Sequence, residues 1–443
     1  MTAPMRVPPS RPLSAGTGSR RTPGLGARAR ASLRTLWSLP GPGVVTGASD
    51  DDPSGIATYS LAGAQTGYRL LWTSLLTLPL NAAVQEICGR IGEVTGQGLA
   101  GVLRRHYPRP LLIVLVTLLF IANTVNIGAD MAAVASGIEL LTGVSQRVLI
   151  VPVAAGIALA EIVVPYRIYA NYLKLLSLVL FAYVADAFLA GPDWGAAIRA
   201  TFLPRIRFDA AFVTTVVAVL GTTISPYLFF WETSEEVEEL HRRGIREGSE
   251  PELRRLRVDT NIGMFLANLV FYFIVLTTAA TLYPAGIRHI DSAREAAEAL
   301  RPLAGDRATY LFAIGFIGTG LLSIPVLAGS AAYAIAEVFD WREGLEEKPS
   351  AAPQFYVAIA VATGIGLLIA LSGVGAIRAL FAAAVINGVI SPVLIAAIVV
   401  VSNDARVLGR HRSGVLANTL GIAAALIMGL AAMTMAVTFV IGA

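Results

Sequence analysis

The 443-residue sequence is 55% hydrophobic and only 14% charged, and its mean hydropathy is +0.67. Ordinary globular chains carry about 25% charged residues, so this composition excludes a soluble enzyme. The 34 basic and 30 acidic residues leave a net charge of +4, which is too small and too scattered for a nucleic-acid-binding surface. Cys88, the single cysteine, cannot form an internal disulfide, and no phosphate-binding loop is present. We therefore expect an integral membrane protein with the lipid bilayer as a partner, no cofactor and no ATP-driven pumping.

The first 40 residues differ from the rest of the chain. They are rich in Arg, Pro, Gly and Ser and contain no apolar stretch long enough for a signal peptide, so residues 1–40 are predicted to be a disordered cytoplasmic tail. Residues 41–443 form the predicted transmembrane domain, because a helix needs roughly 20 apolar residues to cross a bilayer. Basic residues gather in alternate loops, which places the N-terminus in the cytoplasm and, with an odd number of spans, the C-terminus outside. Eleven spans are predicted, at residues 42–66, 69–93, 110–141, 147–165, 168–190, 209–234, 258–283, 308–338, 353–372, 376–401 and 414–441.

The first predicted span contains a charged interruption. Asp50, Asp51 and Asp52 are followed by Pro53 and then by Gly55. Each carboxylate at membrane depth costs about 2.5 to 3.5 kcal/mol on insertion scales. Proline and glycine weaken a helix, and unpaired backbone groups are tolerated in a membrane only where they line a cavity. The pattern predicts that the first helix is broken at a functional cavity.

The sixth predicted span repeats this interruption. Thr222 precedes Ser225, Pro226 and Tyr227, and an apolar half-helix is expected to follow and to end at Glu232. Paired interruptions at corresponding positions of two halves indicate the binding site of an inverted-repeat transporter. An odd number of helices per repeat requires the second copy to insert upside down. The predicted repeats are residues 41–190 and 209–401, with an additional helix at 414–441.

The side chains near the two interruptions offer only oxygen donors. A buried carboxylate repels an anionic substrate but neutralises a cation, so Asp52 is the predicted charged ligand. Ser54, Thr222 and Ser225 add hydroxyl oxygens, with backbone carbonyls around them. Oxygen-only sites suit hard cations such as Mg²⁺, Ca²⁺ or Mn²⁺. For Ser225, a bond back to a carbonyl one turn earlier is an equal alternative.

Other polar residues are weaker candidates for the ion pathway. Asp50 and Asp51 are expected either to face an aqueous vestibule or to bond free N–H groups of the second half-helix. Asp130 ends a polar stripe with two asparagines on the third span, which lines a pathway or forms bonds between helices. Asn387, with Pro392, marks a further break or a packing bond. The residues assigned to the pathway or to the shell around the ion are Ser54, Asp51, Asp130, Tyr227, Glu232 and Asn387.

Several motifs resemble the NRAMP family of divalent-metal transporters, and the resemblance extends over most of the chain. It implies an all-α LeuT-type fold of five plus five transmembrane helices and an eleventh, with helices one and six broken. It also implies an ion site between those two helices and alternating access. The similar segments are Gly41-Pro42-Gly43, Asp52-Pro53-Ser54-Gly55, residues 62–72, Gly92-Glu93-Val94-Thr95-Gly96 and, before the eighth span, Arg301-Pro302-Leu303-Ala304-Gly305.

The departures from the family pattern concern the ligands first. The family motif Asp-Pro-Gly-Asn has Asp and Asn as metal ligands, whereas here Ser54 and Gly55 stand in the last two places. The family motif Met-Pro-His reads Ser225-Pro226-Tyr227 in this chain, so the soft methionine ligand is lost. By position, the resemblance implies a metal site at Asp52, the charged ligand, at Thr222, through its carbonyl, and at Ser225 and Gly55.

The departures also concern protons. The family's histidines fall on Tyr227 and Glu232, and Ala133 replaces a family glutamate, whereas Asp130 matches a family aspartate. Histidines and that glutamate are associated with proton movement in the family. The combination resembles the NRAMP-related magnesium transporter branch, whose members lack the methionine and admit Mg²⁺ down its electrochemical gradient. Replacing a thioether by a hydroxyl removes the preference for Mn²⁺ and Fe²⁺ over harder ions.

The leading hypothesis is uptake of Mg²⁺ and Mn²⁺ by alternating access without obligatory proton coupling. One alternative is a proton-coupled Mn²⁺ or Fe²⁺ symporter, in which Asp52, Asp130 or Glu232 carries protons. Another is an organic-solute symporter, because one fold serves several substrates. An ion sensor or scaffold is disfavoured, since broken helices serve passage more directly than signalling. We expect no enzyme activity, and a monomer in a bacterial inner membrane.

Overall fold

The structure, a computed structural model, describes residues 41–164, 178–245, 248–345 and 347–441. In this part of the chain nearly every element is a helix, which confirms the all-α fold class. Seven helices of the described residues are long and apolar enough to cross a membrane by length and composition. The predicted tail, residues 1–40, lies outside the described residues.

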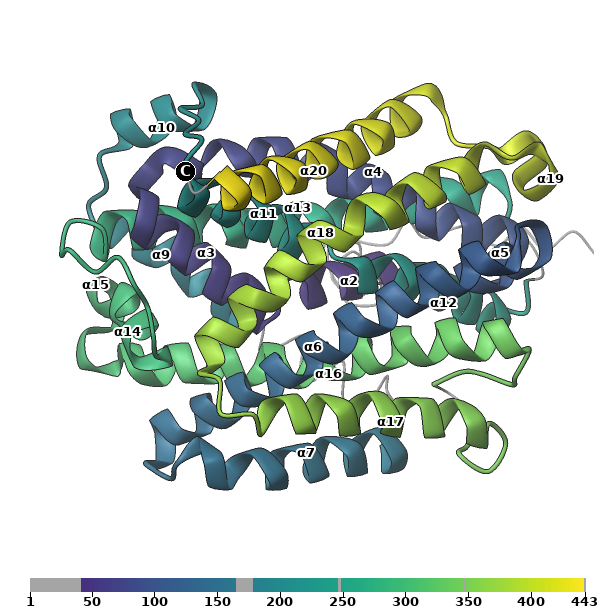
Figure 1. The fold of residues 1–443 in the computed structure, drawn as a ribbon, viewed down its shortest axis with the longest axis horizontal. Coiled ribbons are helices and arrows are strands. Elements are labelled where there is room, and N and C mark those ends of the chain that lie inside the picture. Colours follow the sequence, from purple (N-terminus) through teal and green to yellow (C-terminus); the bar gives the residue numbers. More distant parts are fainter. Residues whose placement is uncertain (1–40, 165–177, 246–247, 346, 442–443) are drawn as a thin grey trace, which may run out of the picture. The chain divides into compact units, whose positions relative to one another are not determined.

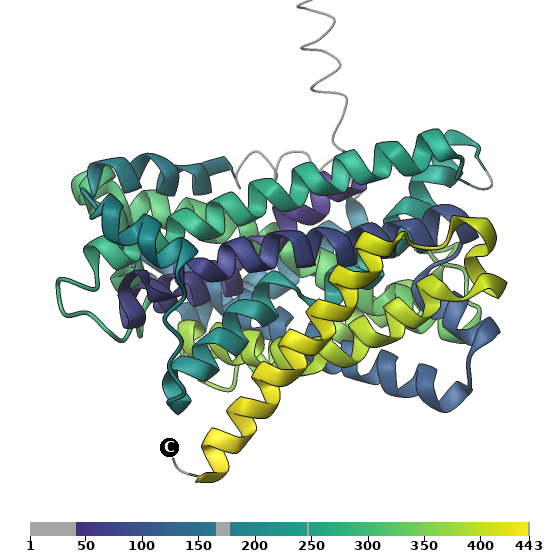
Figure 2. The same ribbon diagram turned by 90° about the horizontal axis from the view of Figure 1, so that it is seen from above.

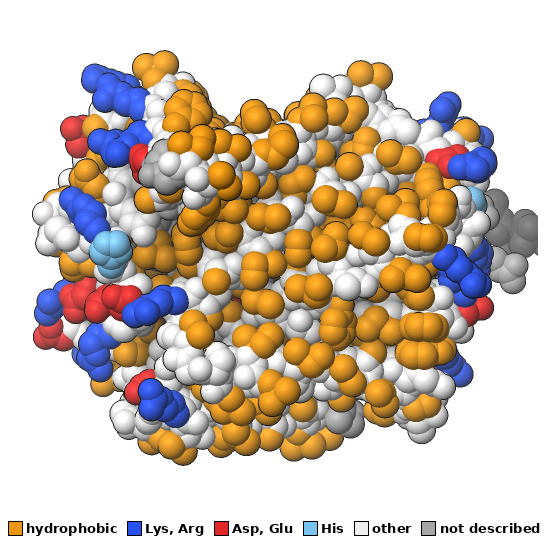
Figure 3. All heavy atoms as spheres, in the orientation of Figure 1, with side chains coloured by type: hydrophobic (Ala, Val, Ile, Leu, Met, Phe, Trp, Pro, Cys, Tyr) orange, Lys and Arg blue, Asp and Glu red, His pale blue; other side chains and the backbone are white. Residues whose placement is uncertain are grey.

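A broad apolar band crosses the face of the bundle seen in Figure 3, and charged side chains gather at its two ends. This distribution is the one expected of a helical bundle surrounded by lipid. The short helices α5 (Leu99–His106) and α19 (Ala405–Leu408) lie at one end, here named the α5 end (Figure 1). The short helices α10 (Trp194–Phe202), α14 (Ala293–Ala297) and α15 (Arg301–Ala304) lie at the other.

The helices of the first half follow the predicted spans closely. The fifth predicted span, residues 168–190, lies partly outside the described residues, and its described part is a 3₁₀ turn (Leu178–Phe181) followed by α9 (Ala182–Leu189). The other long elements of this half are α2 (Pro42–Asp50), α3 (Pro53–Thr66), α4 (Trp72–Thr95), α6 (Arg109–Thr142) and α7 (Gln146–Val163).

The second half contains the corresponding helices. Its elements are α11 (Ala210–Thr223), α12 (Pro226–Arg243), α13 (Glu250–Thr281), α16 (Ala308–Phe339), α17 (Pro353–Ala370), α18 (Ala376–Asn403) and α20 (Val415–Ile441). Packing is reciprocal between the halves: α13 lies along α3, and α4 lies along α12. Helices α6 and α16 pack against each other, and α20 runs along the outside of α18 (Figures 1 and 2).

Glycines allow the broken helices to approach their neighbours at backbone distance. A Cβ at Gly47 on α2 would collide with the backbone of Gly263 on α13. A Cβ at Gly221 on α11 would collide with the backbone of Gly388 on α18. Small residues at such contacts favour helix association in a membrane. Each broken helix is therefore fixed against one unbroken helix.

Two sequence-based expectations about helix ends are wrong. The half-helix expected to end at Glu232 continues to Arg243 and ends at Gly244, which has φ = +67°. Its polar second part stays helical because ion pairs with α13 stabilise it. The further break suggested at Pro392 is absent, because α18 runs unbroken through this residue. Proline is tolerated in a membrane helix where neighbouring groups satisfy the freed backbone.

Candidate metal site

Two helices are interrupted, as predicted, and both interruptions are buried. In the first break, residues 51–52 separate α2 from α3, and in the second break, residues 224–225 separate α11 from α12. Pro53 and Pro226 each occupy the first turn of the half-helix that follows. The missing N–H of proline costs nothing there, because no helical partner exists for it. Local sequence therefore explains both breaks.

Asp52 lies at the first break and is 1% exposed. Its Oδ1 accepts a hydrogen bond from the backbone N–H of Gly55 at 2.7 Å, so the carboxylate caps α3. Its Oδ2 accepts a hydrogen bond from Nδ2 of Asn126 on α6 at 2.9 Å. Gly55 faces the same carboxylate, because a Cβ there would lie 3.6 Å from Oδ1. Helices α3 and α6 together orient the carboxylate.

Hydroxyl groups connect the two breaks. Oγ of Ser54 and Oγ1 of Thr222 lie 2.9 Å apart, which places two predicted site residues in direct contact. The hydroxyl of Tyr227 on α12 donates to the carbonyl of Ser49 at the end of α2, at 2.7 Å. A half-helix from each repeat thus contacts a half-helix from the other, as the inverted-repeat hypothesis requires.

Ser225 bonds back to its own helix. Its Oγ contacts the carbonyls of Gly221 at 2.9 Å and of Thr222 at 2.7 Å. Of the two expectations for this residue, the bond back is therefore the one observed. The carbonyl of Thr222 still has a second lone pair for a cation. The neighbouring carbonyl of Ile224 accepts a hydrogen bond from Ser391 on α18 at 2.8 Å.

The remaining aspartates of the first break are buried. Asp50 is 3% exposed and Asp51 is 5% exposed, so the expectation of an aqueous vestibule around them is wrong for this structure. Oδ2 of Asp50 accepts a hydrogen bond from Nδ2 of Asn81 on α4 at 3.2 Å. Among the described residues, no three His, Cys, Asp or Glu side chains converge as a metal cluster. A cation bound at Asp52 would meet the neutral oxygens of Ser54 and Thr222 beside that carboxylate.

Asp130 lies one helical turn from Asn126 on α6 and is fully buried. Its Oδ2 accepts a hydrogen bond from Ser323 on α16 at 2.6 Å. Its Oδ1 has no hydrogen-bond partner among the residues described here. A Cβ at Gly320 would lie 3.2 Å from Pro53 and 3.6 Å from the Asp130 carbonyl. The structure thus brings Asp130 to the border of the first break.

Glu232 and Asn387 are both buried, Glu232 between helices and Asn387 with a hydrogen bond inside its own helix. Glu232 is 0% exposed, and its carboxylate contacts the hydroxyls of Thr46 on α2 and, at 3.1 Å, of Thr260 on α13. It therefore joins three helices at one point. Asn387 is 1% exposed on α18, and its carbonyl accepts a hydrogen bond from Ser391 at 2.8 Å.

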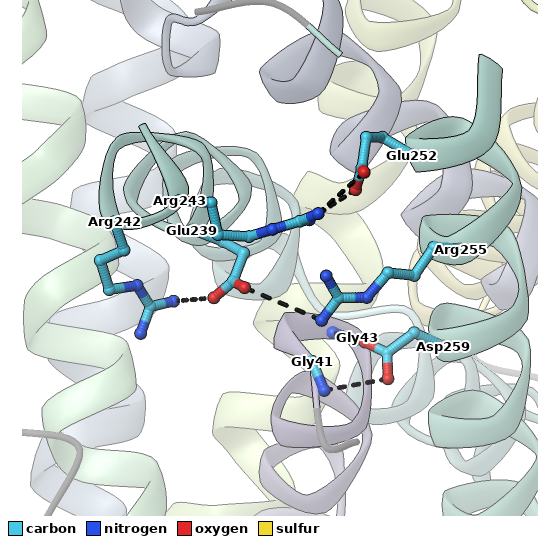
Figure 4. A network of polar contacts seen from close by, with 8 residues as sticks. All are labelled: Gly41, Gly43, Glu239, Arg242, Arg243, Glu252, Arg255 and Asp259. Atoms are coloured by element: carbon cyan, nitrogen blue, oxygen red, sulfur yellow. Dashed lines mark hydrogen bonds and ion pairs between the residues drawn. The ribbon is translucent and has the colours of Figure 1, made fainter. Parts of the chain in front are cut away.

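Asp259 on α13 holds the start of α2, and nearby ion pairs join α12 to α13 (Figure 4). Asp259 on α13 accepts hydrogen bonds from the backbone N–H groups of Gly41 at 3.1 Å and Gly43 at 2.8 Å. These N–H groups begin a helix and have no partner within it. The ion pairs of the network are Arg242–Glu239 at 2.5 Å, Arg255–Glu239 at 3.8 Å and Arg243–Glu252 at 2.5 Å.

Two residues at the site were missed by reasoning from sequence. Asn126 belongs to the polar stripe on the third span, but the sequence did not identify it as a partner of Asp52. Its position four residues before Asp130 puts both side chains on one helix face. Asp259 carried no local signal, since it contacts residues more than 200 positions away. Only the folded arrangement reveals the partners of these two side chains.

Comparisons with known proteins agree with this architecture. A family model described as natural resistance-associated macrophage protein-like matches residues 43–438. The chain is 30% identical over 308 residues to the divalent metal cation transporter MntH of Yersinia pestis, covering 68% of this chain and 73% of the relative.

Two solved structures share the fold. The manganese transporter of Eremococcus coleocola superposes with a TM-score of 0.72 at 17% identity, covering 91% of this chain and 87% of the other. MhsT in complex with L-phenylalanine superposes with a TM-score of 0.59 at 12% identity, covering 90% and 97%. At these identities the likeness shows the fold alone. The LeuT-type architecture implied by the sequence motifs is thereby confirmed.

Proposed function

This chain belongs to the natural resistance-associated macrophage protein-like family, and from that premise we propose that it takes up Mg²⁺ and Mn²⁺ without obligatory proton coupling. It is a multi-pass membrane transporter, and its relatives are named as transporters and not as enzymes. Their names support a divalent metal ion as the transported substrate. The ion would pass by alternating access between the two repeats.

The observation that carries the proposal is the donor set around Asp52. The groups in contact with or facing this carboxylate are the amide of Asn126 and the Gly55 backbone, and the Ser54–Thr222 hydroxyl pair lies beside them. All available ligands are hard oxygens, and Ser225 occupies the place of a soft thioether. Hard oxygen sites favour Mg²⁺ and also accept Mn²⁺. A single carboxylate suits an ion that keeps part of its water shell.

The test is ion uptake into proteoliposomes that contain a metal-sensitive and a pH-sensitive dye. We expect entry of Mg²⁺ and Mn²⁺ without acidification, and its loss in Asp52→Ala. Asp306→Ala, which removes a carboxylate with 98% exposure, should transport like wild type. Mn²⁺ entry with acidification and without Mg²⁺ entry would refute the proposal.

A proton-coupled Mn²⁺ symporter is the second candidate function. The observation in its favour is Asp130, a buried carboxyl group at the border of the first break with one oxygen unpaired among the described residues. Such a group can hold a proton when the metal is absent. In the same vesicles, Asp130→Asn should abolish acidification if the transporter is coupled to protons. An uncoupled transporter would cause no acidification either as wild type or as Asp130→Asn.

The proposal includes a location and an oligomeric state. We propose a cytoplasmic N-terminus, which the excess of basic residues in alternate loops supports, and a location in a bacterial inner membrane. We propose that one chain suffices, because both repeats and both breaks lie within it. Protease accessibility of residues 1–40 in right-side-out vesicles tests the orientation, and cross-linking in the membrane tests the monomer.

A further inference from the structure

A row of residues on one face of α4 begins beside the end of α2. Asn81, Gln85 and Gly89 are spaced four residues apart on α4, so they share one face of the helix. Asn81 contacts Asp50 at the end of α2. Gly89 faces Glu232, because a Cβ there would lie 3.4 Å from the Oε1 atom of Glu232. Gln85 lies on α4 between Asn81 and Gly89. The row therefore leads from the first break toward the α5 end.

Four side-chain atoms of Asp50, Asn81 and Gln85 lack hydrogen-bond partners among the described residues. Asp50, Asn81 and Gln85 are 3%, 2% and 0% exposed. None of the described residues forms a hydrogen bond with Oδ1 of Asp50, with Oδ1 of Asn81, or with Oε1 or Nε2 of Gln85. Leaving a buried polar atom unpaired costs about 1 to 3 kcal/mol. Several such atoms in one row indicate that the row has a ligand.

We propose that Asp50, Asn81 and Gln85 form a second cation position, between the Asp52 site and the α5 end. The proposal rests on the proposed function, because it adds a step to the same ion path. One carboxylate and two amide oxygens are hard donors, which suit a divalent cation that keeps part of its water shell. Nδ2 of Asn81 already holds Oδ2 of Asp50 at 3.2 Å, so Oδ1 is the oxygen left for the cation.

The two cation positions are used in turn. Asp50 and Asp52 are two residues apart in the chain, and two divalent cations at such a separation repel strongly in a medium of low dielectric constant. A cation at Asp50 therefore weakens the hold of Asp52 on a second one. An ion leaving Asp52 toward the α5 end meets Asp50 first and Gln85 next.

Mn²⁺ binding to the full-length protein tests this inference, with free Mn²⁺ followed by electron paramagnetic resonance. We expect Asp52→Ala to retain one saturable Mn²⁺ site, at least tenfold weaker than that of wild type. Adding Asp50→Asn should weaken this remaining binding by at least another tenfold. The matched control is Glu161→Gln in the Asp52→Ala background, because Glu161 is a buried carboxyl group on α7 with one unpaired oxygen among the described residues.

Uptake of Mn²⁺ into proteoliposomes separates this inference from the proposed function. If the chain transports no divalent cation, wild-type vesicles take up no Mn²⁺. If only the second position is wrong, wild-type uptake is intact, Asp50→Asn transports like wild type, and Asp52→Ala binds no Mn²⁺. We expect instead that Asp50→Asn slows uptake about tenfold.

Gln85→Leu distinguishes a ligand from a packing residue. Because the Gln85 amide is buried and unpaired, replacing it by an apolar side chain should raise the unfolding temperature. We expect the same substitution to slow Mn²⁺ uptake and to weaken Mn²⁺ binding in the Asp52→Ala background. A lower unfolding temperature with unchanged binding and uptake would show a purely structural role and overturn the inference.

Discussion

The two breaks have the same outline but are held by different chemistry. The first break carries two aspartates next to a third at the end of α2, and the carboxylate of Asp52 is fixed by an N–H group of α3 and an amide of α6. The second break carries no charge, and Ser225 bonds to carbonyls of its own helix. One repeat therefore supplies the charge of the site, and the other supplies neutral oxygens. An inverted repeat can diverge in this way because the two breaks are built from different residues and contact different helices.

Removing the charge of the first break should have the largest effect. Asp52→Asn keeps the shape of the side chain, and its Oδ1 can still cap α3. We expect Mn²⁺ uptake to fall at least about a hundredfold, which corresponds to about 2.7 kcal/mol, with little change in unfolding temperature. Uptake in proteoliposomes and thermal unfolding of the same preparation measure both. Normal uptake by Asp52→Asn would show that transport does not need a charge from the first break, and the difference between the two breaks would then not matter for transport.

The next effect concerns how each break is packed. Gly47→Ala and Gly221→Ala each place a methyl group against a neighbouring backbone, and we expect each to destabilise the protein by about 1 to 3 kcal/mol. Gly364→Ala is the matched control on α17, because no atom lies within 4 Å of its Cβ position. Thermal unfolding in detergent is the measurement. A lower unfolding temperature in only one of the two variants would show that the two breaks are not packed alike.

The hydrogen bond between the two breaks should contribute less to the free energy of unfolding. Ser54 and Thr222 are joined by one neutral hydrogen bond, which contributes about 1 kcal/mol net. A double-mutant cycle with Ser54→Ala and Thr222→Val should therefore give a coupling of about 1 kcal/mol in the free energy of unfolding. Additive effects of the two substitutions would contradict a direct bond.

The smallest expected effect is at Ser225. Its hydroxyl bonds to Gly221 and Thr222, so Ser225→Ala removes a local bond and frees the Thr222 carbonyl. We expect the KM for Mn²⁺ uptake to change by no more than about threefold, or about 0.65 kcal/mol. A loss of tenfold or more would identify the hydroxyl itself as an ion ligand and make the two breaks more alike.

The sequence predicts the breaks well because their causes are local. Aspartates at membrane depth and a proline within three residues define the first break, and Ser225-Pro226 defines the second. The end of α12 was not predictable, since ion pairs with α13 stabilise its polar second part. The sequence also did not predict the partners of Asp52 and of the α2 N-terminus. Asn126 and Asp259 meet them through packing of helices distant in the chain, which no local pattern encodes.

The cap on α3 limits how Asp52 can hold an ion. Its Oδ1 accepts the N–H of Gly55 and its Oδ2 accepts the amide of Asn126, so each oxygen keeps one lone pair for an ion. The two donors hold the carboxylate in one orientation, and an ion would have to approach along the directions that these donors leave free. The start of α3 therefore sets the direction from which Asp52 can be reached before any ion is bound.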